Sequence, residues 1–202
     1  MPKPIRFTYQ KKEPFRDSFL FIIICEGQNR EPDYFNFFDG LSSRVKIVPI
    51  RSGHGSSPSQ LITKALEVEK EFSLNPTEDK LWFVIDTDRW GLHLHTIREE
   101  TSRHQNWNIA QSNPCFEVWL YFHVLKFLPD AGDISSCGFW KPLLARIIDG
   151  GFNSDFHPIA IEFAIENARI NYQSTGYFPN PGSSELWKLA EQLLPPKVSD
   201  SY

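Results

Sequence analysis

Short apolar runs alternate with helical patterns over much of this chain. The run 19–25 (FLFIIIC) is continuously apolar, which is typical of a parallel strand covered on both faces. Runs at 80–85 and 107–110 predict two more strands, and 45–50 predicts a strand that Pro49 places toward an edge. The alternation predicts an α/β fold with a mainly parallel, four-stranded sheet and helices on both of its faces.

Helix signals occupy the segments between these runs. Pro32 fits the first turn of a helix after the first strand. Segment 57–60 (SPSQ) has the form of a capping box and opens a helix that runs to about Phe72. Residues 93–104 predict a polar helix. In 113–125, an Asn-Pro pair predicts the start of a helix that is apolar almost all round, so this segment must be buried.

The pattern loosens toward the C-terminus, where helices are expected at 159–170 and 185–194. Differences in the hydrophobic pattern along the sequence divide the chain into three expected parts. They are an N-terminal arm at 1–17, an α/β core at 18–125, and a mainly helical extension at 126–202 packed on that core.

Composition indicates a soluble globular protein, since 41% of the 202 residues are hydrophobic and 23% are charged. The apolar runs are too short to cross a bilayer and no signal peptide is apparent, so a cytoplasmic location is expected. The three cysteines lack a metal-ligand spacing, which favours reduced thiols. The net charge of -4 argues against nucleic-acid binding by bulk electrostatics, so a polynucleotide would need a local patch or a partner.

Four carboxylates stand in apolar settings. Asp86 and Asp88 end a strand and point to one face, where they repel each other unless a cation lies between them. Glu26 follows the first strand, so all three meet at one rim of a parallel sheet. Three oxygen ligands suit Mg²⁺ or Mn²⁺, and Glu117 is a candidate second-metal ligand or water activator. Magnesium-assisted phosphoryl chemistry is therefore predicted.

Simpler roles exist for each of these groups. Asp86 and Asp88 could cap the next helix, and Glu26 and Glu117 are both favourable near a helix N-terminus without any metal.

The loop at 53–57 offers a second candidate contact with substrate. His54 and Ser56 lie in it just before a predicted helix, where main-chain N–H groups can bind phosphate, although a plain connection explains the loop equally well.

Several motifs, in order, resemble the RloB-like family. They are 24–35 (ICEGQNREPDYF), 55–58 (GSSP), 84–88 (VIDTD) and 112–120 (SNPCFEVWL), and 180–186 (NPGSSEL) resembles the closing motif of that family. The resemblance implies a Toprim-like (Rossmann-like) fold, which is shared by topoisomerases, primases and the overcoming-lysogenisation-defect nucleases.

The resemblance also implies a function. Glu26, Asp86 and Asp88 match the Toprim acidic pattern and would hold Mg²⁺ or Mn²⁺ in a nuclease acting on DNA or RNA, with Glu117 assisting. The family is associated with restriction and abortive-infection defence against phage, often beside an AAA-type ATPase, and a homodimer is possible. The positive charge that stabilises the transition state is expected from one of three basic residues: Arg30, Lys64 or Arg89.

A non-catalytic role is the alternative. In it, the chain is a Toprim-like regulatory subunit that uses metal only for structure and docks on an ATPase through aromatic residues that follow Lys126.

Overall fold

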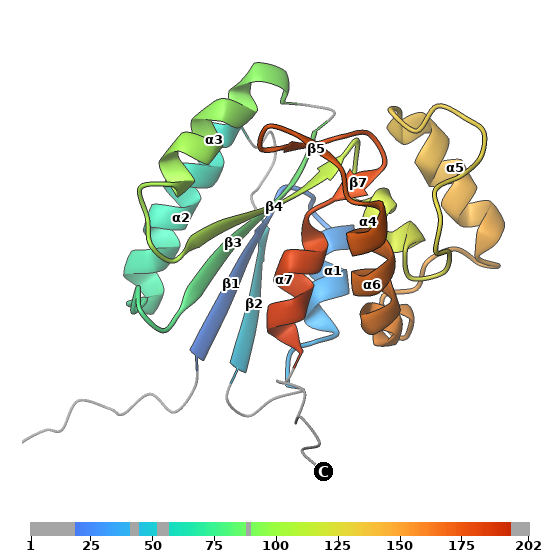
Figure 1. Cartoon of the computed structure of the whole chain (residues 1–202). Coiled ribbons are helices and arrows are strands. Elements are labelled where there is room, and N and C mark those ends of the chain that lie inside the picture. Colours follow the sequence, from blue (N-terminus) through green and yellow to red (C-terminus); the bar gives the residue numbers. More distant parts are fainter. Residues whose placement is uncertain (1–18, 41–44, 52–56, 88–89, 195–202) are drawn as a thin grey trace, which may run out of the picture.

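The computed structural model of the chain describes residues 19–40, 45–51, 57–87 and 90–194 (Figure 1). The predicted N-terminal arm lies outside these residues.

A mainly parallel sheet forms the centre of the fold, with the strand order β2-β1-β3-β4-β7 in the described part of the chain. Its parallel strands are β1 (Phe19–Cys25), β2 (Val45–Arg51), β3 (Lys80–Asp86) and β4 (Trp107–Asn113). The short β7 (Ser183–Ser184) pairs antiparallel with the end of β4. The four predicted strands are confirmed, and β7 is an addition that the sequence pattern did not predict.

Helices cover both faces of this sheet (Figure 1). One face carries α2 (Pro58–Phe72) and α3 (Leu94–Thr101), the latter preceded by a 3₁₀ turn at Gly91–His93. The remaining helices pack on the other face: α1 (Arg30–Asn36), α4 (Glu117–Tyr121), α5 (Cys137–Ile147), α6 (Ile161–Asn171) and α7 (Leu186–Leu193). A 3₁₀ turn (His157–Ala160) precedes α6, and a small hairpin of β5 (Ser174–Thr175) and β6 (Phe178–Pro179) precedes β7.

Alternate residues of β1 face two separate hydrophobic cores. Ile22 and Ile24 pack in the core beneath α2 and α3, whereas Ile23 and Cys25 pack in the core that includes α1 and the C-terminal helices. This two-sided burial is the reason that the β1 sequence is apolar at consecutive positions rather than at alternate ones. No helix among the described residues is both long enough and apolar enough to cross a membrane.

Two local predictions are confirmed in atomic detail. The Ser57 N–H donates to Gln60 Oε1 at 2.6 Å and the Gln60 N–H donates to Ser57 Oγ at 3.3 Å, so the capping box is formed. The strand that contains Pro49 lies at the edge of the sheet, where a residue without an N–H donor is tolerated.

The predicted helix start at Pro114 is wrong. The chain stays extended through Asn113, whose side-chain amide donates to Pro179 O at 2.8 Å and whose carbonyl accepts from Gly182 N–H at 2.8 Å. Those two bonds hold the strand against the closing motif, so α4 begins only at Glu117 and ends at Tyr121. The predicted burial is confirmed for residues 114–123, which are all buried, and is wrong for Val124 and Leu125, which are exposed beyond the end of α4.

Helix α5 was not predicted, for a physical reason. It contains Gly138 near its start and Pro142 in its interior, two residue types that disfavour helix. It is stabilised by a cap at Ser136, whose Oγ accepts from Gly138 N–H at 3.2 Å, and by the burial of Trp140 and Leu144.

Candidate functional site

The strand order places a ligand-binding rim between β1 and β3. The chain leaves β1 toward one edge of the sheet through α1 and leaves β3 toward the other edge through α3, so their carboxyl ends form the switch point of a doubly wound sheet. A cavity of about 460 Å³ opens at this rim. Its lining is mostly polar and consists of residues 26–31, Asp86, Phe116, Glu117 and Lys141.

Glu26 links the ends of the two central strands. Its N–H donates to Val84 O at 3.0 Å, which continues the parallel ladder one residue beyond β1. Its Oε2 accepts from the main-chain N–H of Asp86 at 3.0 Å. The side chain is buried. The predicted meeting of Glu26 and Asp86 at one rim is therefore present in the structure.

Glu31 lines the same cavity as Glu26 and Asp86, and the sequence analysis did not identify it. It is buried in the first turn of α1. Burial raises the pKa of its carboxyl, and the neighbouring charges of Glu117 and Glu26 raise it further, against the lowering effects of its own main-chain hydrogen bond and of Arg30. The only sequence signal for Glu31 is its closeness to the Glu26-Gly27 pair, which it follows by four residues.

Gly27 provides the space that the Glu31 carboxyl occupies. A Cβ atom at residue 27 would overlap the carboxyl group of Glu31. The absence of a side chain at Gly27 thus allows the Glu31 carboxyl to approach the main chain beside Glu26.

Glu117 and Arg30 form an ion pair across the cavity. Arg30 Nη1 lies 2.7 Å from Glu117 Oε1, and the Glu117 side chain is buried while that of Arg30 is half exposed. The pair joins the first residue of α1 to the first residue of α4. Of the two predicted sources of positive charge that the structure describes, Arg30 and Lys64, Arg30 is the one that lies beside the carboxylates.

Lys141 supplies a second cationic group to this cavity, from α5. Sequence reasoning did not identify it because α5 itself was not predicted. Its position means that the C-terminal part of the chain contributes to a cavity that is otherwise lined by the strand ends, the start of α1 and the start of α4.

The cavity lining is chemically suited to a divalent cation. Four carboxylates (Glu26, Glu31, Asp86 and Glu117) face two cationic side chains, which leaves a formal charge of -2 among the described lining residues. Burial is the main cause of the raised pKa of Glu31, and the like charges of Glu117 and Glu26 raise it further. Oxygen-only donors of this kind are those that Mg²⁺ and Mn²⁺ prefer.

A complete set of metal ligands is not assembled by the described residues alone. In the part of the chain that the structure describes, no three Asp, Glu, His or Cys side chains are close enough together to hold a metal ion. Asp88, the third predicted ligand, lies outside the described residues. The set of Glu26, Asp86 and Asp88 therefore stays a prediction.

The other predicted substrate contacts are placed as follows. Lys64 is on α2, where it forms an ion pair with Glu67 at 3.5 Å, and it does not line the cavity. His54, Ser56 and Arg89 lie outside the described residues.

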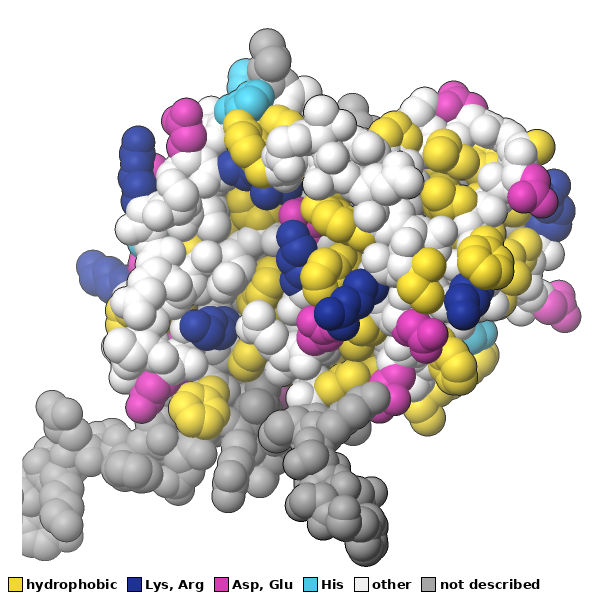
Figure 2. All heavy atoms as spheres, viewed as in Figure 1, with side chains coloured by type: hydrophobic (Ala, Val, Ile, Leu, Met, Phe, Trp, Pro, Cys, Tyr) yellow, Lys and Arg dark blue, Asp and Glu magenta, His cyan; other side chains and the backbone are white. Residues whose placement is uncertain are grey.

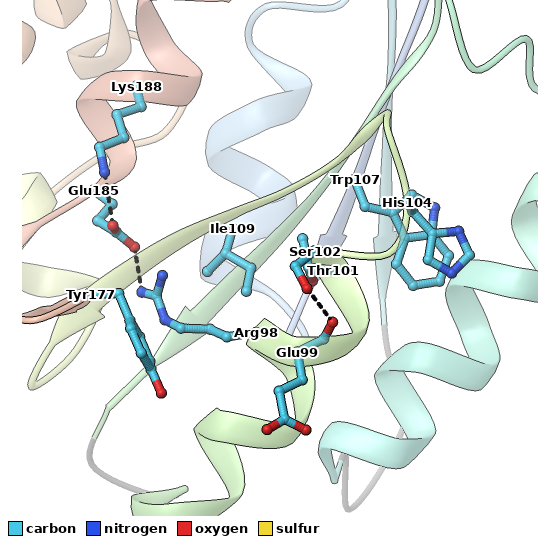
Figure 3. Close-up of a pocket in the computed structure, with 10 residues that line it drawn as sticks. All are labelled: Arg98, Glu99, Thr101, Ser102, His104, Trp107, Ile109, Tyr177, Glu185 and Lys188. Atoms are coloured by element: carbon cyan, nitrogen blue, oxygen red, sulfur yellow. Dashed lines mark hydrogen bonds and ion pairs between the residues drawn. The ribbon is translucent and has the colours of Figure 1, made fainter.

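A second, open cavity of about 560 Å³ lies along β4 between α3 and α7 (Figure 3). There Arg98 points toward Glu185, with its Nη2 at 2.7 Å from Glu185 Oε2, and the ring of Tyr177 lies beside it. Lys188 Nζ is 2.8 Å from the other Glu185 oxygen. Because these charges satisfy one another and connect α3 to α7, a structural role explains this network, and we assign the functional site to the acidic cavity.

Comparison with protein families gives one match. A model described as RloB-like protein matches residues 21–193, from within β1 to the last residue of α7. The match therefore includes both the strands that carry Glu26 and Asp86 and the helix that carries Lys141. Comparisons with curated proteins and with solved structures give no match.

Proposed function

Since the chain belongs to the RloB-like family, we propose that it is a metal-dependent nuclease that hydrolyses phosphodiester bonds in DNA or RNA. The observation that carries this proposal is the convergence of Glu26, Glu31, Asp86 and Glu117 on one cavity at the carboxyl ends of β1 and β3. An acidic rim on a sheet with this strand order also supports the Toprim-like fold that the family resemblance implies.

The side chains of the cavity divide into groups with different tasks. Glu26 and Asp86, with Asp88, would hold Mg²⁺ or Mn²⁺. When bound, such an ion neutralises charge on the phosphate and lowers the pKa of a water molecule. Glu117 is held in place by Arg30 and would orient the attacking water. Lys141 carries a positive charge toward the phosphate oxygens, where negative charge increases during hydrolysis.

The proposed biological setting is supported by the family resemblance rather than by the site. As part of the proposal, the nuclease acts as an effector in anti-phage defence of the abortive-infection kind, together with an AAA-type ATPase. An ATPase partner would also bring polynucleotide to a chain whose net charge of -4 gives it little general affinity for phosphate.

One observation is also expected of an alternative function, that of a non-catalytic subunit that docks on an ATPase. Large apolar side chains are exposed after Lys126, including Phe127, Ile159 and Phe163, of which Ile159 is 78% exposed. Figure 2 shows hydrophobic side chains at the surface in the region where α5 and α6 lie in Figure 1. Apolar surface of this kind is typical of a protein interface. It is equally compatible with a nuclease that has a partner.

Cleavage assays with matched variants separate these functions. The purified chain is incubated with plasmid DNA and with labelled single-stranded RNA in Mn²⁺, with and without a partner ATPase. We expect Glu26→Gln and Asp86→Asn to reduce cleavage by about 100-fold or more, because each removes a charged group that acts directly in the reaction. The control is Glu67→Gln, which removes an exposed carboxylate on α2.

Lys141 is tested in the same assay. Lys141→Ala should lower the cleavage rate by about 10-fold or more, whereas Arg146→Ala, which removes an exposed cation from the same helix, should not change it. Full cleavage by Glu26→Gln and Asp86→Asn would overturn the assignment of the site. Absence of cleavage under every condition, together with a stable complex with the ATPase, would favour the docking subunit.

A further inference from the structure

Two cysteines distant in sequence meet beside the acidic cavity. The thiol of Cys115 lies beside that of Cys137, and neither takes part in a disulfide. Burial raises the pKa of the Cys115 thiol, and the neighbouring Glu117 carboxylate and Cys137 thiol raise it further. Cys115 is only 1% exposed, whereas Cys137 is partly exposed and is the first residue of α5. Both pack in the same hydrophobic core.

These cysteines lie on the two segments that bring side chains to the cavity. Cys115 stands two residues before Glu117, and its thiol lies beside that carboxylate. Cys137 stands one helical turn before Lys141. A covalent bond between the cysteines would therefore join the start of α4 to the start of α5 at the site itself.

We propose that Cys115 and Cys137 are an oxidation site, and that the disulfide between them lowers the activity of the acidic cavity. The effect on cleavage rests on the proposed nuclease function, but formation of the disulfide does not. The reduced pair is the active form, in agreement with the reduced thiols expected from the sequence.

A peroxide is the oxidant class that this chemistry needs. The sulfur of Cys137, which is the more exposed, attacks the O–O bond of hydrogen peroxide, so that an S–O bond forms and water leaves. The sulfur of Cys115 then attacks that of Cys137, an S–S bond forms, and hydroxide leaves and takes up the Cys115 proton as water. In total, two thiols and one peroxide give one disulfide and two waters.

Bond formation changes the geometry of the site. The sulfurs must approach each other to about 2.05 Å, which draws the first turn of α5 toward the start of α4. Glu117 and Lys141 then move relative to Glu26 and Asp86. Because a misplacement of about 1 Å can reduce a reaction rate by about 100-fold, we expect the oxidised protein to cleave at least about 10-fold more slowly, with recovery in dithiothreitol.

The test combines peptide mapping with cleavage. The full chain is treated with hydrogen peroxide, digested without reductant, and searched by mass spectrometry for a cross-link between peptides that contain Cys115 and Cys137. Cys137→Ser should abolish both the cross-link and the loss of activity. Cys25→Ala removes a buried thiol of β1, which donates to Ile23 O, and it should leave both effects intact.

The peptide map tests whether the disulfide forms, and the cleavage rate tests whether it lowers activity. A cross-link with slower cleavage supports the proposal, and absence of the cross-link overturns it. A cross-link with unchanged cleavage overturns the regulatory role. If the reduced protein cleaves nothing, the nuclease function fails, and the peptide map alone decides whether the cysteines form an oxidation site.

Discussion

At the residue scale, the crowding of carboxylates around Glu26 is the feature that most needs a cation. Glu31 is buried next to the charges of Glu26 and Glu117, and Arg30 only partly offsets them. Glu26 and Asp86 could be predicted to meet because they follow strands that run the same way. Glu31 could not be predicted, because it lies among polar residues at the start of the predicted helix and only the packing of α1 buries it.

The raised pKa of Glu31 predicts a dependence of stability on pH. Its native-state pKa lies above the value of 4.5 typical of an exposed glutamate, so the ionised form destabilises the native state as the pH rises past that value. Without divalent metal, Glu31→Gln should therefore unfold at a higher temperature than the unchanged protein at about pH 8, and the difference should shrink toward about pH 4.

Thermal unfolding in EDTA across this pH range measures the effect. Added Mn²⁺ should stabilise the unchanged protein more than Glu31→Gln, because the ion offsets the repulsion that the substitution has already removed. A Glu31→Gln variant that is less stable than the unchanged protein at about pH 8 in EDTA would contradict this account.

At the element scale, regular strands and capped helices could be predicted, and elements that depend on tertiary contacts could not. Helix α2 carries its own start signal in Ser57 and Gln60. The two-residue strand β7 is too short to show any pattern, and its place is fixed by contacts such as the hydrogen bond between Ser112 Oγ and Ser184 Oγ at 2.9 Å. Helix α5 is stabilised by packing despite Pro142.

Glu185, in the closing motif at 180–186, is expected to stabilise the fold. This residue is buried and accepts hydrogen bonds from Arg98, Lys188 and Tyr172. Glu185→Gln should lower the free energy of unfolding by about 2–3 kcal/mol, because it leaves the largely buried Arg98 without its counter-charge.

Urea denaturation provides the measurement for this variant. The matched control is Glu191→Gln, which breaks an exposed ion pair between α7 and Arg169 of α6 and should cost less than about 0.5 kcal/mol. Equal effects of the two substitutions would show that the Glu185 network does not hold α3 and α7 to the sheet.

At the scale of the whole molecule, two parts of the sequence meet at one site. The sheet contributes Glu26 and Asp86, and the C-terminal helices contribute Lys141. The α/β class and the parallel sheet could be predicted from periodicity. The contribution of α5 could not, because it depends on how a helix more than fifty residues after β3 folds back over the rim.

The central claim is that the acidic cavity binds the divalent metal that the proposed hydrolysis requires. A crystal of the protein soaked in Mn²⁺ tests it most directly, through the anomalous scattering of the metal. We predict an anomalous peak within coordinating distance of the Glu26 and Asp86 carboxylates, with Asp88 as a further ligand, and no such peak in Asp86→Asn. Saturating Mn²⁺ with no peak at this rim, or a peak only at a distant site, would contradict the account.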